Sequence, residues 1–282
     1  MPEIIASRGA QVGLVPVRRA LPTRGRRTVG AWCFADHLGP ASVTEDNSVD
    51  IGPHPHCGLQ TVTWLVDGEI LHRDSLGSEQ PIRAGQLNLM TAGHGVSHAE
   101  EATGRYRGDL HGIQLWVALP EATRHGAAAF EHHAELPQLD LGSATAAVLV
   151  GTFAGTASPA RADTDHLGVE VRLAAGTTVA PVEPVHEHAL VVLTGGLLVD
   201  GAPLGPGAIA LLPPGRDELP LEAAEPSTAM LLGGTPFPDR LAMRWNWVAR
   251  SNDELDAAEA AWRADDDRFG TVASPLARIP FP

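Results

Sequence analysis

The stretch HPHCGLQTVTWLVDG, from His54 to Gly68, begins with a His-x-His pair and continues as an apolar run that ends in an Asp-Gly turn. Further along the chain, HEHALVVLTGG from His186 to Gly196 has the same order of His-x-His, apolar run and glycine turn. Apolar runs of this length, bounded by turn residues, are typical of β-strands. The repeated order predicts one β-rich unit that occurs twice in the chain.

Glycine and proline separate the other apolar runs. The 282 residues include 30 glycines and 23 prolines, which are scattered rather than clustered. The short apolar runs between them cover residues 59–66, 82–90, 113–119, 146–150, 190–193 and 209–212. Many short strands at regular spacing are typical of an all-β sandwich or barrel. We expect two antiparallel β-barrel domains, over residues 1–130 and 131–282, with the joint within 121–141.

A helix is expected only near the end of the chain. Residues 251–254 read SNDE, in which the Ser251 hydroxyl accepts a hydrogen bond from the amide three residues on and Glu254 reaches back. Leu255, Ala258 and Trp262 then recur at helical spacing. We expect one amphipathic helix that covers part of a barrel and ends near Gly270. Three tryptophans are expected to pack in this region: Trp245, Trp247 and Trp262.

Composition and charge exclude several classes of protein. The net charge of -14 makes the chain a poor generic nucleic-acid binder, because phosphate contacts need a basic face. Residues 1–30 hold six arginines and one acid, which we interpret as a solvated edge paired with the acidic body. Two cysteines cannot form a disulfide framework, and no apolar run approaches the roughly 18–20 residues of a membrane-spanning helix. Without a signal-peptide pattern in residues 1–8, we expect a soluble cytoplasmic protein with no membrane partner.

Two pairs of residues with a spacing of two carry the candidate chemistry. Residues two apart in a strand share a face, so His54 and His56 converge on one side. His98 and Glu100 have the same spacing. Two such strands side by side would direct three imidazoles and one carboxylate to one point, a donor set that suits a divalent first-row metal with open positions. The alternative is that each pair is exposed or hydrogen-bonded internally.

The second copy lacks a full set of candidate ligands. His186 and His188 repeat the first pair, but residues 211–221 contain Arg216, Asp217 and Glu218 and no histidine. We interpret the pair as the remnant of a metal site. The remaining histidines considered show no ligand pairing in the sequence: His72, His111, His125, His132, His133 and His166.

Several motifs resemble the signature of the pirin family. They are HPHCGLQTVTW at 54–64, HRDSLG at 72–77, MTAGHG at 90–95 leading to HAE at 98–100, and WNWVAR at 245–250. The similarity is concentrated in residues 15–120. The resemblance implies a bicupin, with two jelly-roll β-barrels in one chain and an iron site in the N-terminal barrel. It places the metal ligands at His54, His56, His98 and Glu100.

Three positions need separate interpretation. Many pirins have glutamate where this chain has Gln60, which we expect beside the ligands, orienting a water or an imidazole. Many have arginine where this chain has His94, which lies either at the mouth of the site or in the 93–95 turn. Cys57 follows a ligand directly, so its side chain should point to the opposite face, buried and inert or with a redox role.

The resemblance implies two alternative functions. Some pirins open flavonols in the manner of quercetin 2,3-dioxygenase, which would make Glu100 the catalytic proton acceptor and a quercetin-like flavonol or another enol the substrate, with O2. The cofactor would be one divalent metal ion, Fe(II) first, with Mn, Ni, Co, Cu and Zn open. The alternative is a non-enzymatic, redox-sensitive regulatory protein of metabolism or transcription that binds a protein partner, with no direct contact to nucleic acid.

Overall fold

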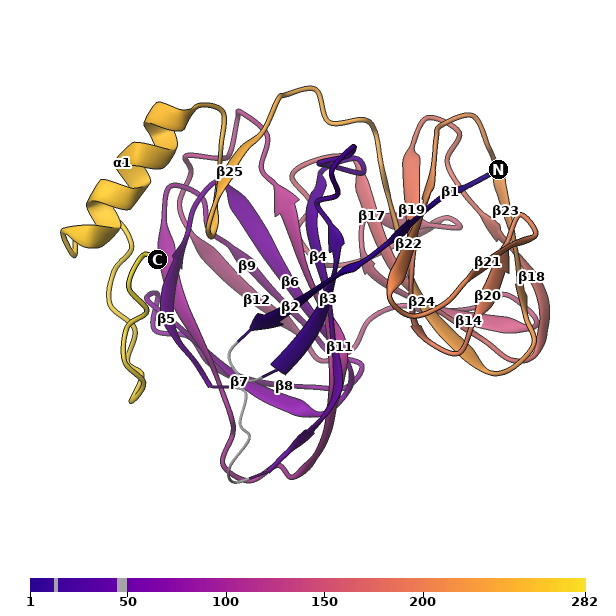
Figure 1. Ribbon diagram of the computed structural model, residues 1–282, viewed down its shortest axis with the longest axis horizontal. Helices are drawn as coiled ribbons and strands as arrows, with labels where there is room; N and C mark the ends of the chain where they lie inside the picture. The colour runs from indigo at the N-terminus through magenta and orange to yellow at the C-terminus, as the bar shows by residue number, and fades with distance from the viewer. Residues whose placement is uncertain (13–14, 45–49) are drawn as a thin grey trace. The chain divides into compact units, whose positions relative to one another are not determined.

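The computed structural model describes residues 1–12, 15–44 and 50–282, and these residues are mostly strands (Figure 1). They divide into two compact units. The first unit comprises Met1–Gly9, Arg18–His37 and Glu135–Phe237, and the second comprises Ala10–Val17, Leu38–Ala134 and Pro238–Pro282. The prediction of an all-β fold is confirmed. Within the described residues, no helix has the length and apolar character needed to cross a membrane.

The second unit is built from a large and a small antiparallel sheet. The large sheet has the order β12-β9-β6-β11-β4-β3-β2, and the small sheet has the order β5-β10-β7-β8. The strands are β2 (Arg8–Val12), β3 (Val15–Leu21), β4 (Trp32–Val43), β5 (Ile51–His56), β6 (Leu59–Asp67), β7 (Glu69–Asp74), β8 (Glu79–Arg83), β9 (Leu87–Thr91), β10 (Val96–Glu101), β11 (Gly108–Ala118) and β12 (Ala129–His133). Of β2, β3 and β4, only residues 10–12, 15–17 and 38–43 belong to this unit.

The two sheets of the second unit enclose an apolar core. Leu65 and Leu110 from the large sheet pack in one cluster with Ile70 and Ile82 from the small sheet. Strands that face each other in two sheets are the jelly-roll form of an antiparallel β-domain. The cupin architecture expected from the sequence therefore takes the form of two facing sheets.

The first unit repeats this arrangement with other strands. Its large sheet has the order β1-β22-β19-β24-β17-β14-β13, and its small sheet has the order β18-β23-β20-β21. The strands are β1 (Glu3–Ala6), β13 (Gln138–Asp140), β14 (Ala144–Val150), β17 (His166–Leu173), β18 (Gly176–Pro181), β19 (Glu187–Thr194), β20 (Leu197–Val199), β21 (Ala202–Leu204), β22 (Ala208–Leu212), β23 (Glu218–Ala223) and β24 (Ser227–Gly234), with a separate hairpin of β15 (Thr152–Phe153) and β16 (Thr156–Ala157).

Alternation of side chains explains how the first unit forms its core. In β23 the sequence ELPLEA alternates exposed and buried positions, as expected for a strand with one face on the core. The buried Leu219 and Leu221 of this strand pack in one cluster with Val169, Leu190 and Leu231 of the large sheet. The duplication predicted from the two His-x-His segments is therefore a duplication of a two-sheet unit.

The C-terminal helix α1 spans Asn252–Arg263, and its start follows the predicted cap. The Ser251 side chain accepts a hydrogen bond from the backbone N–H of Glu254. Leu255, Ala258 and Trp262 are its buried residues, as the spacing predicted. The helix ends at Arg263, several residues before Gly270. Trp247 and Trp262 belong to one buried cluster, and Trp245 packs against it.

Two features differ in detail from the sequence expectation. Residues 82–90 hold the end of β8 and most of β9, because a turn at Gly85, with φ of 77°, interrupts the apolar run. The helix α1 and the hairpin of β25 (Ala242–Arg244) and β26 (Trp247–Ala249) pack within the second unit, together with residues 38–134. The chain passes from the second unit to the first between Ala134 and Glu135, inside the segment 121–141. The boundary at residue 130 stays a prediction.

Candidate metal centre

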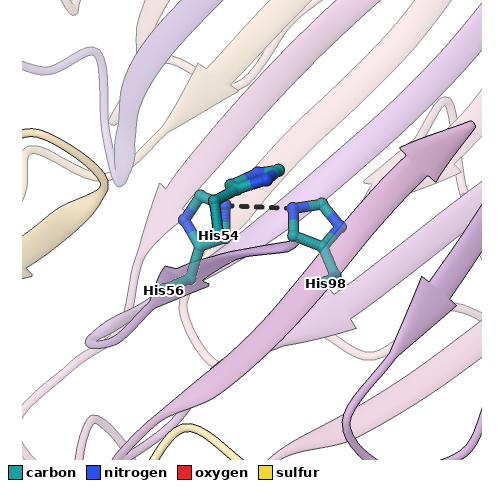
Figure 2. A group of neighbouring side chains, drawn as sticks. All are labelled: His54, His56 and His98. Carbon is teal, nitrogen blue, oxygen red and sulfur yellow. Dashed lines mark hydrogen bonds between the residues drawn. The ribbon is translucent and has the colours of Figure 1, made fainter. Parts of the chain in front are cut away.

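Two neighbouring strands of the small sheet carry the three histidines of the candidate site. In the antiparallel ladder of β5 and β10, His98 lies opposite His54, and Val96 lies opposite His56. Cross-strand partners project from the same face of a sheet. The three imidazoles therefore gather on one side, and their candidate ligand atoms all lie within 4.8 Å of one another (Figure 2).

Proline is tolerated in the His-Pro-His segment because of where β5 lies in its sheet. β5 is an edge strand, with β10 as its neighbour. Proline has no backbone N–H to donate to a neighbouring strand, so it is accepted at edges, where one side of the strand has no neighbour in the sheet. Pro55 can therefore separate two inward-facing histidines without breaking the ladder. The sheet edge and the alternation of the strand together produce the convergence of His54 and His56.

The imidazole rings are close-packed and buried. Ring centroids are 5.1 Å apart for His54 and His56, 4.3 Å for His54 and His98, and 4.9 Å for His56 and His98. The Nε2 atoms of His56 and His98 are 3.1 Å apart, the contact drawn as a dashed line in Figure 2. Trp116 meets the His56 ring edge-on at 5.2 Å and forms part of the surrounding wall.

Backbone carbonyls determine which nitrogen of two rings carries the proton. His54 Nδ1 lies 2.9 Å from the Gly52 carbonyl oxygen, and His56 Nδ1 lies 3.0 Å from the Asn246 carbonyl oxygen. A carbonyl oxygen only accepts hydrogen bonds, so both Nδ1 atoms donate N–H. In a neutral imidazole the other nitrogen then holds a lone pair. The Nε2 atoms of His54 and His56 therefore each present a lone pair that could bind a metal ion.

Burial keeps these imidazoles neutral. It lowers the pKa of His54 to about 4. Burial, and then the neighbouring histidines, hold the pKa values of His56 and His98 well below the ordinary value. Metal ions bind the neutral form of imidazole, so no proton has to be removed near pH 7.

The donor set fits a bound cation. With Nδ1–H of His56 bonded to a carbonyl, a hydrogen bond between the two Nε2 atoms requires the proton on His98 Nε2. His98 Nδ1 would then present a lone pair to His72 Nδ1, 3.4 Å away. A positive ion among the Nε2 atoms makes a proton between them unnecessary, because all three rings can then present Nε2 lone pairs to it. The arrangement is that of metal-binding histidines with their far nitrogens hydrogen-bonded.

Glu100 stands on the same face but outside the three-histidine group. It lies opposite Ile51 of β5 and His72 of β7. The register against β5 shifts between His98 and Glu100, and such a bulge bends a strand locally. Burial raises the pKa of Glu100 to about 7, so its carboxyl group can exchange a proton near neutral pH. Its roles as fourth ligand and proton acceptor stay predictions.

The two residues expected beside the ligands have different surroundings. Gln60 is fully buried, and its Nε2 donates to the Thr91 hydroxyl at 3.0 Å. Its Oε1 has no hydrogen-bond partner among the described residues, and its role near the metal stays a prediction. His94 is exposed, and its backbone forms two hydrogen bonds: its N–H donates to the Gly126 carbonyl, and its carbonyl accepts from Arg268 Nε. This environment favours the turn interpretation of His94.

Cys57 points away from the histidines, as the alternation predicted. It packs in the cluster that contains Trp247, Leu255 and Trp262. Burial raises the pKa of its thiol to about 11. Because the thiolate is the reactive form of cysteine, this environment favours the buried, unreactive interpretation of Cys57 over the redox role.

His72 is the residue of the site that sequence reasoning missed. It was grouped with the histidines that show no pairing, but it lies on β7 with Nδ1 3.4 Å from Nδ1 of His98. Its Nε2 lies 2.9 Å from Oδ2 of Asp74. Burial alone would raise the pKa of Asp74, but hydrogen bonds from His72 and Ser78 lower it, so the carboxylate is ionised. The signal available in the sequence was His72-x-Asp74, a third pair with a spacing of two.

The second His-x-His pair makes no comparable cluster. His186 Nε2 bonds to Asp165 Oδ2 at 2.9 Å, whereas both nitrogens of His188 are buried without a partner among the described residues. Among the residues that the structure describes, the only group of three or more potential ligands is His54, His56 and His98. The description of His186 and His188 as a remnant is therefore consistent with their geometry.

Replacement of His188 by leucine is expected to stabilise the protein. Leucine removes two buried nitrogens that have no partner among the described residues, and its apolar side chain suits the core that contains Leu190 and Val192. The substitution should therefore raise the unfolding free energy by about 1 kcal/mol at pH 7. Burial lowers the pKa of His188 to about 4 from 6.5. Between these values the unfolded chain binds the extra proton, so wild-type stability falls by about 2 kcal/mol from pH 7 to pH 5.

Urea unfolding of wild type and His188→Leu at both pH values measures this difference. In His188→Leu, the unfolding free energy should no longer show the part of the decrease between pH 7 and pH 5 that comes from His188. His125→Gln, at an exposed histidine, controls for the loss of one imidazole. A variant that is less stable at pH 7, or equally sensitive to pH, would contradict the assignment.

Comparison with known proteins agrees with this architecture. The sequence matches the pirin family over residues 14–117 and the pirin C-terminal cupin domain over residues 168–270. A Pseudomonas aeruginosa protein named "Putative quercetin 2,3-dioxygenase PA1205" is 44% identical over 270 residues, which cover 95% of this chain and 85% of that protein. A pirin-like protein of Caulobacter vibrioides is 37% identical over 268 residues, 93% of this chain and 92% of that protein.

A solved structure extends the comparison to the whole fold. The crystal structure of quercetin 2,3-dioxygenase from Acinetobacter baumannii matches with a TM-score of 0.96 at 39% identity, covering 100% of this chain and 95% of that one. Both cupin domains and the three-histidine group thus agree with the resemblance first suggested by the HPHCGLQTVTW motif. The chain belongs to the pirin family.

Proposed function

We propose that this pirin is a metal-dependent dioxygenase that opens quercetin-like flavonols or another enolic substrate with O2. One divalent metal ion would be held by His54, His56 and His98, with Glu100 as the fourth ligand. One observation carries the proposal: buried, neutral imidazoles gather their candidate ligand atoms within 4.8 Å. The relatives named as quercetin 2,3-dioxygenases support the reaction class.

The metal, when bound, supplies a Lewis acid that lowers the pKa of a substrate hydroxyl. The three imidazoles hold it without adding charge. Glu100, the one carboxylate of the set, would then accept the hydroxyl proton. Trp116 beside His56 and Phe130 beside His72 provide aromatic surface close to the site. A flat aromatic enol is the class of substrate that such walls favour.

Fe(II) is the metal we propose. A nitrogen-rich set with one carboxylate and open positions is the donor pattern of non-haem Fe(II) oxygenases. The same donors also accept Mn, Ni, Co, Cu and Zn, so the metal present in the cell decides between them. Cys33 and Cys57 are both buried and form no disulfide, in keeping with the reducing cytoplasm where we expect the protein to act.

The test combines elemental analysis with oxygen uptake. The full chain is purified without added metal, analysed, then stripped and reloaded separately with Fe(II), Mn(II), Ni(II) and Co(II). Oxygen consumption and carbon monoxide release are measured with quercetin, other flavonols and simple enols. We expect near-stoichiometric metal, and uptake of oxygen that disappears after stripping and returns on reloading.

Two results would overturn the proposal in different ways. A chain that retains no metal under any loading condition has no metal site at these histidines. A fully loaded chain that consumes no oxygen with any substrate is not a dioxygenase of enols, and the regulatory function then becomes the better explanation.

A further inference from the structure

His98 is held differently from the other two histidines of the site. The Nδ1 atoms of His54 and His56 donate to backbone carbonyls, at Gly52 and Asn246. His98 Nδ1 instead faces Nδ1 of His72 at 3.4 Å. The Nδ1 atom of His98 thus contacts a side chain rather than the backbone. This contact can therefore be changed by a substitution at residue 72.

The side chain of His72 is itself fixed from two directions. Its ring stacks on Phe130, with centroids 4.3 Å apart and an angle of 14° between the planes. Its Nε2 lies 2.9 Å from Asp74 Oδ2. Both groups are buried, with His72 5% and Asp74 2% exposed, so water does not compete for this bond.

Asp74 is held in turn by the loop that follows β7. Its Oδ1 accepts hydrogen bonds from the backbone N–H groups of Leu76 at 2.9 Å and Ser78 at 3.0 Å. The other oxygen, Oδ2, is left for His72. The carboxylate therefore performs two separate tasks with its two oxygens, and the position of Oδ2 is set by the turn.

The chemistry of these contacts determines where each proton lies. A carboxylate only accepts, so His72 Nε2 carries the hydrogen and donates it to Asp74. When a metal takes the lone pair of His98 Nε2, the hydrogen of the His98 ring lies on Nδ1 and faces His72 Nδ1 at 3.4 Å, so the acceptor in this contact is the Nδ1 lone pair of His72. His98 is left with its lone pair on Nε2, on the side of His54 and His56.

We propose that Asp74 and His72 form a relay of hydrogen bonds that sets the ring orientation and the tautomer of His98, so that its Nε2 lone pair is directed to the metal. Both are positioning residues that do not touch the metal. The inference rests on the metal site proposed above. Carboxylate or carbonyl groups that orient a ligating histidine commonly contribute about 10- to 100-fold in metal affinity.

Three substitutions separate this role from simple packing. His72→Phe keeps an aromatic ring against Phe130 and removes the acceptor. His72→Gln restores an acceptor, because its carbonyl oxygen can take the hydrogen of His98 Nδ1. Asp74→Asn keeps Oδ1 for the turn but places an N–H donor opposite His72 Nε2. The His72 hydrogen must then move to Nδ1, where it faces the Nδ1–H of His98, so that two donors meet.

Zinc affinity, measured by competition with a chelator of known affinity, is the first readout. We expect the zinc dissociation constant to rise by about 10- to 100-fold in His72→Phe and Asp74→Asn, and to recover most of that loss in His72→Gln. His132→Phe is the matched control, because His132 is a half-buried histidine of the same unit that bonds to Asn88. Equal affinities for wild type, His72→Phe and Asp74→Asn would overturn the proposal.

Nitrogen NMR of histidine-labelled protein is the second readout, and it does not depend on activity. In zinc-loaded wild type we expect a scalar coupling between His98 Nδ1 and His72 Nδ1 across the N–H···N bond, which Asp74→Asn abolishes. A loaded wild type without this coupling overturns the relay even if affinity changes. If wild type binds no zinc, the metal site itself has failed, an outcome distinct from a zinc-loaded protein that lacks the coupling.

Discussion

Replacement of Glu100 by glutamine is expected to slow turnover by about 10²- to 10⁴-fold while most metal binding remains. Glutamine has nearly the same shape, but it cannot accept the proton of a substrate hydroxyl. Glu100 lies outside the three-histidine group, so its loss leaves those ligand atoms in place. Oxygen uptake at saturating substrate and metal content by elemental analysis, on the same preparation, give the two quantities.

The control for Glu100→Gln is Glu101→Gln on the same strand. Glu101 follows directly, lies on the opposite face and pairs with Arg73. We expect this neighbour to keep both metal and turnover. A parallel loss of metal and activity in Glu100→Gln would make Glu100 a ligand only, without a role in proton transfer.

Removal of one imidazole is expected to abolish both metal binding and oxygen uptake. His56→Ala removes one of three neutral donors from a buried site. Loss of a residue that only orients a ligand lowers metal affinity by about 10- to 100-fold, and loss of a ligand itself should lower it further. Binding stabilises a folded protein by about 2.7 kcal/mol when free metal is 100-fold above the dissociation constant. Added metal should therefore raise the melting temperature of wild type and leave that of His56→Ala unchanged.

Two further variants make the His56 result specific. His56→Gln retains more of the side-chain volume and covers the case in which alanine disturbs folding. His94→Ala removes an exposed histidine of the same unit. Metal retained in His94→Ala and lost in both His56 variants supports the assignment, whereas metal retained in either His56 variant contradicts it. Metal lost in His94→Ala would place that residue at the mouth of the site.

Local patterns in the sequence were sufficient for the parts of the fold that depend on neighbouring residues. The two-residue spacing placed His54 with His56 on one face, because side chains alternate in any strand. The cap at Ser251 and the helical spacing after it located α1, because these signals act within one turn. Recurrence of the His-x-His order revealed the duplication before any contact between strands was known.

Contacts between distant segments could not be predicted in the same way. The carbonyl that orients His56 belongs to Asn246, and His72 reaches His98 from another strand. The offset of Glu100 accompanies a register shift between β5 and β10, and α1 packs with the second unit although it lies near the C-terminus. The register of each strand and the neighbour it pairs with are set when strands assemble around a core. Small differences in free energy among many possible pairings then determine which pairing forms. The sequence by itself therefore determined which residues share a strand face, while the tertiary structure decided which faces meet and how the histidines are oriented.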